Sequence, residues 1–544
     1  MRSTGSAIWF VVAAGMLGLS AGARAKPDIP GTVGVATLEG ERLSGPLFAS
    51  GVEGHSILDS VTVIVTVDRD GRVIAAEPGE HSMRNLPPPL VWRGAEPPPG
   101  PAIAAARQWR FRPQQFEGHP VQAIGAIRIG YPVPEQPVDE QAVFPEGSPA
   151  DTEITLERTS CFVGCPMYTV TVNGEGRVRF SADPATSHVA LPGVHDAQIS
   201  PQAATELIDA FRDHHFAGLQ PMYRADLSDT ATIILTLKRG GRTIRVTDLT
   251  GGFVTTPKAL RTLQSEVDRV TDTDRWTYGN AQTIAAMKAQ GMDFASAEIA
   301  EIAASVIRRH SFDAPLERQR DVGAFLRGLV EQGAALEMPV NGRTGETIPP
   351  KLPLGRLIAH FSTMTGDEAL FSEMNRRGYV ARMTAEERDS AFAAGAGCNV
   401  AVARGLLSAG ADPQAQGEWG NAWHALGARS GFCEDVEARM DAFVDVMIAA
   451  RVSPGAVNEA GDMPLHSLRS LALARGLIRA GARLDAQAGD GATALLSTDD
   501  DRIALTLLRA GADPHAGAGV GALRARAVEY HWPATLAWLD AKGL

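Results

Sequence analysis

The sequence predicts a multidomain protein with two small α+β domains followed by an all-α solenoid of stacked helical repeats. The chain has 544 residues, enough for two to four domains at roughly 100–200 residues each. Short β-rich runs alternate with turns in the first half, whereas the last part repeats a helix that ends in Gly. Hydrophobic residues make up 44% and charged residues 21% of the chain, which excludes wholesale disorder.

The net charge of −12 argues against a nucleic-acid partner, because phosphate binding needs clustered Lys and Arg. Aromatic residues make up only 6% of the chain. We therefore expect a core built mainly of Ala, Val and Leu, which suits closely stacked helices.

Residues 1–25 have the pattern of a cleaved signal peptide. Arg2 provides the positive start, Ile8–Leu19 the apolar stretch and Ala23-Arg24-Ala25 the cleavage site. The expected localisation is periplasmic or secreted, with no membrane segment left after cleavage. The alternative is an uncleaved inner-membrane anchor, although the apolar segment is at the short limit for crossing a bilayer.

The cysteines are expected to pair locally as Cys161–Cys165 and Cys398–Cys433, because an even count in an oxidising compartment permits disulfides. No further ligands stand near the first pair, which disfavours zinc. A thiol-redox role for Cys161 and Cys165 stays open as an alternative function, although a strand rather than a helix is expected to follow them.

Residues 26–55 are expected to form an N-terminal extension, and residues 56–133 the first α+β domain. The order β-β-α-β-β and the string Ala-Ala-Arg-Gln-Trp-Arg-Phe-Arg-Pro at 105–113 resemble the C-terminal domain of TonB-type energy transducers. In that family an exposed sheet edge captures an extended peptide. The resemblance implies an accessory role in TonB-dependent transport as an alternative function, or a small domain reused as a spacer.

Residues 134–150 are polar and contain several prolines, as expected of a linker. Residues 151–280 are expected to form the second α+β domain. The string Cys-Phe-Val-Gly-Cys-Pro-Met-Tyr at 161–168, the hairpins after it and Trp276 resemble a bacterial exported family of unknown function. That resemblance implies no activity.

The last part of the chain contains a repeat of about 30 residues. A helix ending in Gly and followed by Ala-Asp-Pro recurs at Gly410 and Gly511, and Met-Pro-Leu-His precedes the helix that ends at Gly481. This pattern resembles ankyrin repeats, and implies an ankyrin-type solenoid over residues 403–544. Residues 281–402 match poorly and are expected to form irregular helical pairs or degenerate repeats.

A solenoid offers a concave surface, built of loop tips and inner helices, to a protein partner. The candidate contact residues at the loop tips are Glu418, Trp419, Glu459, Asp462, Asp490 and His515. Trp419 is the strongest candidate for a partner contact, because exposed aromatic side chains often anchor interfaces. For each of these residues the alternative to a partner contact is a side chain that is simply solvated. For Trp419 a further alternative is packing between repeats. We expect His424 and His466 to bond neighbouring loop backbone.

No catalytic, cofactor-binding or metal-binding motif is recognised. Gly18–Gly22 matches G-x-S-x-G only inside the signal peptide, and Asp68–Gly71 begins a calcium-type loop whose later ligands are missing. The predicted function is therefore an exported, non-enzymatic protein-binding or scaffold protein with an unidentified protein partner, no cofactor and no metal.

Overall fold

The computed structural model describes most of the chain. The described residues are 29–38, 41–48, 60–79, 99–131, 136–161, 165–224, 230–249, 256–309, 316–342, 351–429 and 436–544. The expected signal peptide lies outside them. So does Cys433, and with it the expected pairing to Cys398.

The N-terminal sheet has four strands in the order β1-β8-β3-β4. The strands are β1 (Thr32–Thr37), β3 (Ser60–Val67), β4 (Val73–Pro78) and β8 (Gln122–Gly130). Helix α1 (Pro99–Ala106) packs on β3, β4 and β8. Strand β3 alternates buried valines with half-buried residues, because successive side chains of a strand point to opposite faces.

Two short strand pairs complete the N-terminal region. They are β2 (Arg42–Ser44) with β5 (Arg110–Phe111), and β6 (Gln115–Phe116) with β7 (His119–Pro120). The Trp109 indole is buried, and its Nε1–H donates to the Pro46 carbonyl at 2.7 Å. Residues 41–48 are therefore held on the same folded body as residues 99–131.

The central sheet has seven strands in the order β12-β11-β10-β9-β14-β15-β13. Its strands are β9 (Thr152–Arg158), β10 (Tyr168–Asn173), β11 (Arg177–Ala182), β12 (Gly193–Gln198), β13 (Met222–Tyr223), β14 (Ile233–Arg239) and β15 (Arg242–Asp248). Helices α2 (Pro201–Asp213) and α3 (Lys258–Thr271) pack on each other. Leu260, Leu263 and Val267 form the buried stripe of α3, at the spacing of one helix face.

The helical array follows the central sheet. Its first, irregular part contains α4 (Asp274–Thr277), α5 (Ala281–Ala289), α6 (Ala297–Arg309), α7 (Leu316–Glu331), α8 (Leu354–Thr365), α9 (Glu368–Arg376) and the hairpin of β16 (Pro339–Asn341) with β17 (Lys351–Pro353). Among the described residues, none of these or the later helices combines the length and apolar character needed to span a bilayer.

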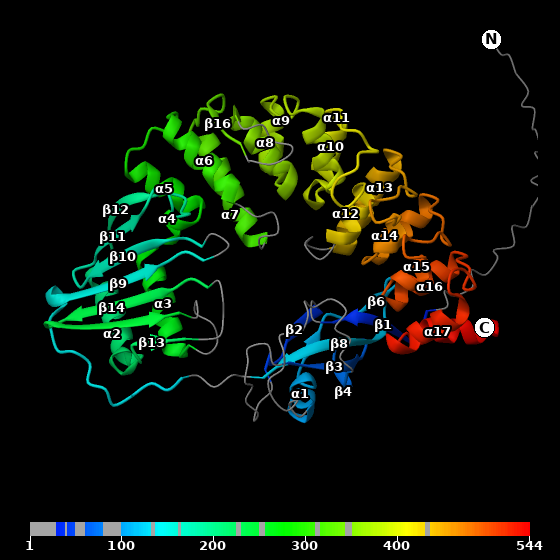
Figure 1. Ribbon diagram of the computed structural model, residues 1–544, viewed down its shortest axis with the longest axis horizontal. Helices are drawn as coiled ribbons and strands as arrows, with labels where there is room; N and C mark the ends of the chain where they lie inside the picture. The colour runs from blue at the N-terminus through cyan, green and yellow to red at the C-terminus, as the bar shows by residue number, and fades with distance from the viewer. Residues whose placement is uncertain are drawn as a thin grey trace, which may run out of the picture.

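The rest of the array consists of two rows of helices. One row is α11 (Val400–Ser408), α13 (Val436–Ala449), α14 (Leu471–Arg479), α16 (Asp501–Arg509) and α18 (Pro533–Lys542); the other is α10 (Ala385–Ala393), α12 (Ala422–Arg429), a 3₁₀ helix (Pro464–Ser467), α15 (Ala494–Ser497) and α17 (Gly519–Glu529). Within each row every helix packs on the next. In Figure 1 the array forms an arc with α11 on its outer rim and α12 nearer its centre.

The N-terminal sheet docks on the far end of this arc (Figure 1). Strand β1 packs on α16 and α18. The buried Asp501 carboxylate accepts hydrogen bonds from the backbone N–H groups of Gly34 at 3.1 Å, Ala534 at 2.9 Å and Thr535 at 2.8 Å. One carboxylate therefore joins the first strand to the last helix, whose first-turn N–H groups have no partner within the helix.

Glycine at position 34 is required by this contact. A Cβ there would lie 2.1 Å from the His531 carbonyl oxygen. At the edge of the interface, Arg509 pairs with Glu117 at 3.4 Å and lies over the Phe116 ring. The chain is thus closed on itself, through pairs such as Gly34 and Asp501 that are 467 positions apart.

The expected fold class, two small α+β domains followed by an all-α solenoid, is wrong. The N-terminal region is not a small α+β domain, because β1 joins its sheet from residues before position 56 and packs on the last helices of the chain. The helical part also contains the β16–β17 hairpin. The Thr-Val-Gly-Val-Ala-Thr sequence of β1 lacks the alternation of apolar and polar residues that is typical of a half-exposed strand. The sequence pattern therefore did not predict this strand.

Candidate protein-binding surface

The loops after the outer helices are held by hydrogen bonds to the preceding repeat, in one case to helix α10 and in another to the preceding loop. The Asp412 N–H donates to the Asp389 carboxylate, and the Asp513 N–H to that of Asp485, both at 2.7 Å. The helices α11, α14 and α16 are each followed by a glycine with positive φ. This left-handed residue ends the helix and turns the chain into the loop.

His424 and His466 connect their helix starts to the following loop, as expected. Nε2 of His424 lies 3.0 Å from the Asp462 carbonyl oxygen, and Nε2 of His466 lies 2.9 Å from that of Ala486. In each ring Nδ1 lies within hydrogen-bond distance of a backbone N–H three residues earlier, which suits a neutral ring that donates through Nε2, and in His424 it also lies 3.0 Å from the Asn421 side-chain oxygen. Burial lowers the pKa of His424, which favours this neutral form.

Trp419 lies at the tip of the loop between α11 and α12, with 48% of its surface exposed. Packing between repeats therefore does not account for its side chain. Gly417 and Gly420 bond each other in both directions at 2.8 and 3.1 Å, which holds the turn that presents the indole. The Asn458 side-chain amide of the next loop donates to the Trp419 carbonyl at 3.4 Å.

The other expected contact residues fall into two groups. Glu418 and Glu459 are exposed, and no ion-pair partner for either lies among the described residues. By contrast, the carboxylates of Asp462 and Asp490 accept backbone N–H groups, from Gly489 at 3.3 Å and Ala492 at 2.9 Å. These two residues therefore shape the loops.

His515 is exposed in the loop after α16. Its own backbone N–H donates to the Asp513 carboxylate at 2.9 Å, so backbone bonding fixes the turn and leaves the imidazole outside.

Val457 belongs to this surface and was missed by the sequence analysis. It is 52% exposed and directly precedes Asn458, the residue that bonds the Trp419 loop. Two exposed apolar side chains therefore occupy neighbouring loops. The sequence did contain one indication of this residue. Val457 is an apolar residue in the loop between Pro454 and the start of the next helix, where it does not fit the spacing of a buried helix face. We call Glu418, Trp419, Val457 and Glu459 the loop-tip surface.

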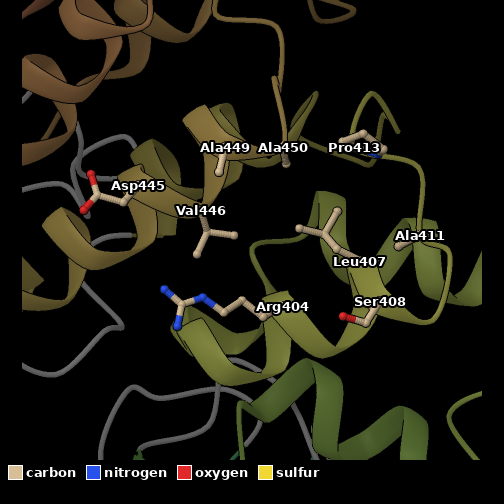
Figure 2. Close-up of a pocket in the computed structure, with 9 residues that line it drawn as sticks. All are labelled: Arg404, Leu407, Ser408, Ala411, Pro413, Asp445, Val446, Ala449 and Ala450. Carbon is tan, nitrogen blue, oxygen red and sulfur yellow. The ribbon is translucent and has the colours of Figure 1, made fainter.

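A groove of about 590 Å³ lies between α11 and α13. Figure 2 shows Leu407 and Val446 directed into the space between the two helices, with Arg404 and Asp445 at one end. Alanines and Ser408 line much of the rest, so the groove reflects short side chains at the contact of two outer helices. Asp445 is already paired with Arg479 at 3.4 Å.

The central sheet contains a partly buried polar cluster beside the disulfide. Arg158 bonds the Asp268 carboxylate at 2.6 Å, and the Tyr168 hydroxyl donates to the same carboxylate at 2.7 Å. Burial raises the pKa of Tyr168, and the Asp268 carboxylate raises it further. The cluster joins β9 and β10 to α3, and it holds an uncharged phenol rather than a reactive group.

The expected Cys161–Cys165 disulfide is confirmed, with a Cα–Cα distance of 5.3 Å. It precedes the Pro-Met-Tyr segment that brings Tyr168 into the cluster. In the described part of the chain, no group of three or more His, Cys, Asp or Glu side chains is arranged to hold a metal ion.

Comparison with solved structures finds a similarity to the crystal structure of the ankyrin repeat domain of Bcl-3, described as a unique member of the IkappaB protein family. The identity is 21%, the match covers 38% of this chain and 90% of that one, and the TM-score is 0.23. No curated protein matches the chain, and none of the comparisons shows a TonB-type domain.

A family model does match part of the chain. Residues 152–271 match a domain of unknown function, DUF6438. The expected resemblance of the second domain to a family of unknown function is confirmed to that extent, and this segment of the chain is similar to the DUF6438 family.

Proposed function

We propose that this protein is an exported, non-enzymatic scaffold that binds a protein partner through its loop-tip surface. The observation that carries the proposal is the exposure of Trp419 on a turn fixed by backbone hydrogen bonds. An aromatic side chain held in place before binding loses little conformational freedom in a complex. Such residues are common among the few that dominate interface energies.

The bonding between loops supports the same proposal. Asn458 ties the Trp419 loop to its neighbour, and Asp462 ties that neighbour to the loop beyond. The loop tips therefore form one continuous surface whose backbone is set before a partner arrives. A partner that binds such a surface does not have to order the loops, so the complex loses little conformational entropy.

Export is proposed from two features. The signal-peptide pattern of residues 1–25 is one. The Cys161–Cys165 disulfide is the other, because structural disulfides persist in oxidising compartments and are rare in the cytosol.

Site-directed photocrosslinking of the full-length protein in its native cells tests the proposal. A photoreactive amino acid replaces Trp419, and a control replaces Arg404, an exposed residue of the groove between α11 and α13 (Figure 2). We expect the first position to give a discrete crosslinked protein that the second does not. Equal products from both positions, or none from the first, would refute binding at the loop tips.

A second candidate function is capture of an extended peptide by strand addition at β4. This strand is the outermost member of the N-terminal sheet as described, and Ile74 on it is 56% exposed. An unpaired strand edge can bind an extended segment through main-chain hydrogen bonds. Crosslinking from Ile74 in the same cells, with an extended periplasmic receptor segment as product, would favour this function.

A further inference from the structure

We infer that the partner segment bound by the loop-tip surface is basic and carries a large apolar side chain. This inference rests on the proposed function and adds the chemistry of the partner. Trp419 and Val457 supply the apolar part of the surface, at 48% and 52% exposure, on loops joined by the Asn458–Trp419 hydrogen bond. Two neighbouring apolar side chains are a suitable contact for one apolar side chain of a partner.

The loops that follow the outer helices of this region carry more negative than positive charge. The loops after α11, α13, α14 and α16, residues 410–421, 451–463, 481–493 and 511–518, contain seven carboxylates and two arginines, an excess of five negative charges. Glu418 directly precedes Trp419, and Glu459 follows Val457 by two residues. The two arginines, Arg451 and Arg483, lie instead just after the C-terminal ends of α13 and α14, away from the loop tips.

The carboxylates nearest the apolar pair are available to a partner. Glu418 and Glu459 are exposed and have no ion pair within the described residues. A segment with Lys or Arg on both sides of an apolar residue would place its cations against them, and an Arg could also lie over the Trp419 ring. An acidic segment would meet like charges at the same places, so charge complementarity selects a basic partner.

Three fluorescein-labelled peptides of equal length test the inference against the full-length protein. The first is Gly-Lys-Arg-Leu-Leu-Lys-Arg-Gly, the second has Glu in place of every Lys and Arg, and the third has Ser in place of both Leu. Fluorescence anisotropy is read at about 50 and about 300 mM NaCl, because surface charge contacts weaken as the screening length shortens.

We expect the first peptide to bind at least about tenfold more tightly than the other two. The double substitution Trp419→Ala with Val457→Ser should weaken it about tenfold or more, and Glu418→Gln with Glu459→Gln should remove most of its salt dependence. The matched control is Val528→Ser, because Val528 is 63% exposed on α17, outside the loop-tip surface. This control should leave binding unchanged.

The inference would be overturned if the first peptide did not bind, or if the acidic peptide bound as tightly as the first. It would also be overturned if the first peptide bound the Trp419→Ala, Val457→Ser variant as tightly as the unmodified protein. The proposed function fails separately, when photocrosslinking from position 419 captures no protein. A partner crosslinked there through an acidic segment would keep the function and refute the inferred chemistry.

Discussion

Replacing Asp501 with Ala tests the contact between the two ends of the chain. The substitution removes the acceptor of three backbone hydrogen bonds, from Gly34, Ala534 and Thr535. A buried N–H left without a partner costs about 1–3 kcal/mol. Burial raises the pKa of Asp501, so relief of carboxylate desolvation offsets part of the loss. We expect a net local destabilisation of about 3–5 kcal/mol.

Native-state hydrogen exchange is the suitable assay, because a multidomain chain does not unfold in a single two-state transition. At about 1.4 kcal/mol per factor of ten, exchange in β1 and the first turn of α18 should accelerate by about 10²- to 4 × 10³-fold. The central sheet should not change. Asp499→Ala is the matched control, since Asp499 lies just before the start of α16 and pairs with Arg526 rather than with β1 or α18.

A second substitution approaches the same contact from the other side. Gly34→Ala places a Cβ 2.1 Å from the His531 carbonyl oxygen, so it should loosen the same segments while leaving Asp501 intact. Unchanged exchange in β1 and α18 in both variants would refute the role assigned to this interface.

Three further predictions concern other parts of the molecule. Reducing the Cys161–Cys165 disulfide should lower the unfolding free energy of the central sheet by about 2 kcal/mol, the loop-entropy value for so short a loop, in denaturant melts with and without a reductant. Asp268→Asn should cost about 3–5 kcal/mol in the same melts, because it leaves the partly buried Arg158 without its counter-charge; a loss below about 1 kcal/mol would contradict this. Hydrogen bonding from Arg382 lowers the pKa of Glu337 from its ordinary 4.5 to about 2, so this pair stabilises the fold above pH 4.5 and loses that effect as pH falls towards 2. In Arg382→Ala an NMR titration should place the Glu337 pKa above its original value but still below 4.5, because the Tyr379 hydroxyl still donates to this carboxylate; an unmoved value would contradict the pairing.

The repeat architecture was largely predictable because its signals are local. The glycines after the outer helices and the histidines at helix starts depend on their own repeat and its neighbour, within about 40 residues. The place of Trp419 in an exposed loop was predictable for the same reason, since the repeat pattern fixes both ends of that loop. The hairpin strands of the central sheet were also expected, because each pair is joined by a short turn.

The closure of the chain was not predictable from the sequence. In the sequence, Asp501 ends a run of three aspartates just before Ile503, which suits a charged first helical turn equally well. Its contact with Gly34 depends on a sheet assembled from residues 32–130 and on the accumulated curvature of the helical array. Val457 was missed because a single apolar residue in a loop carries no periodic signal, and only the Asn458 hydrogen bond shows that its loop adjoins the Trp419 loop.

The most direct test of the proposed scaffold role is the affinity of the purified full-length protein for the partner captured at position 419. We predict that Trp419→Ala raises Kd by about 30-fold or more, the loss typical of a central interface aromatic, while Val528→Ser leaves it unchanged. An unaltered Kd for Trp419→Ala would contradict binding through the loop-tip surface.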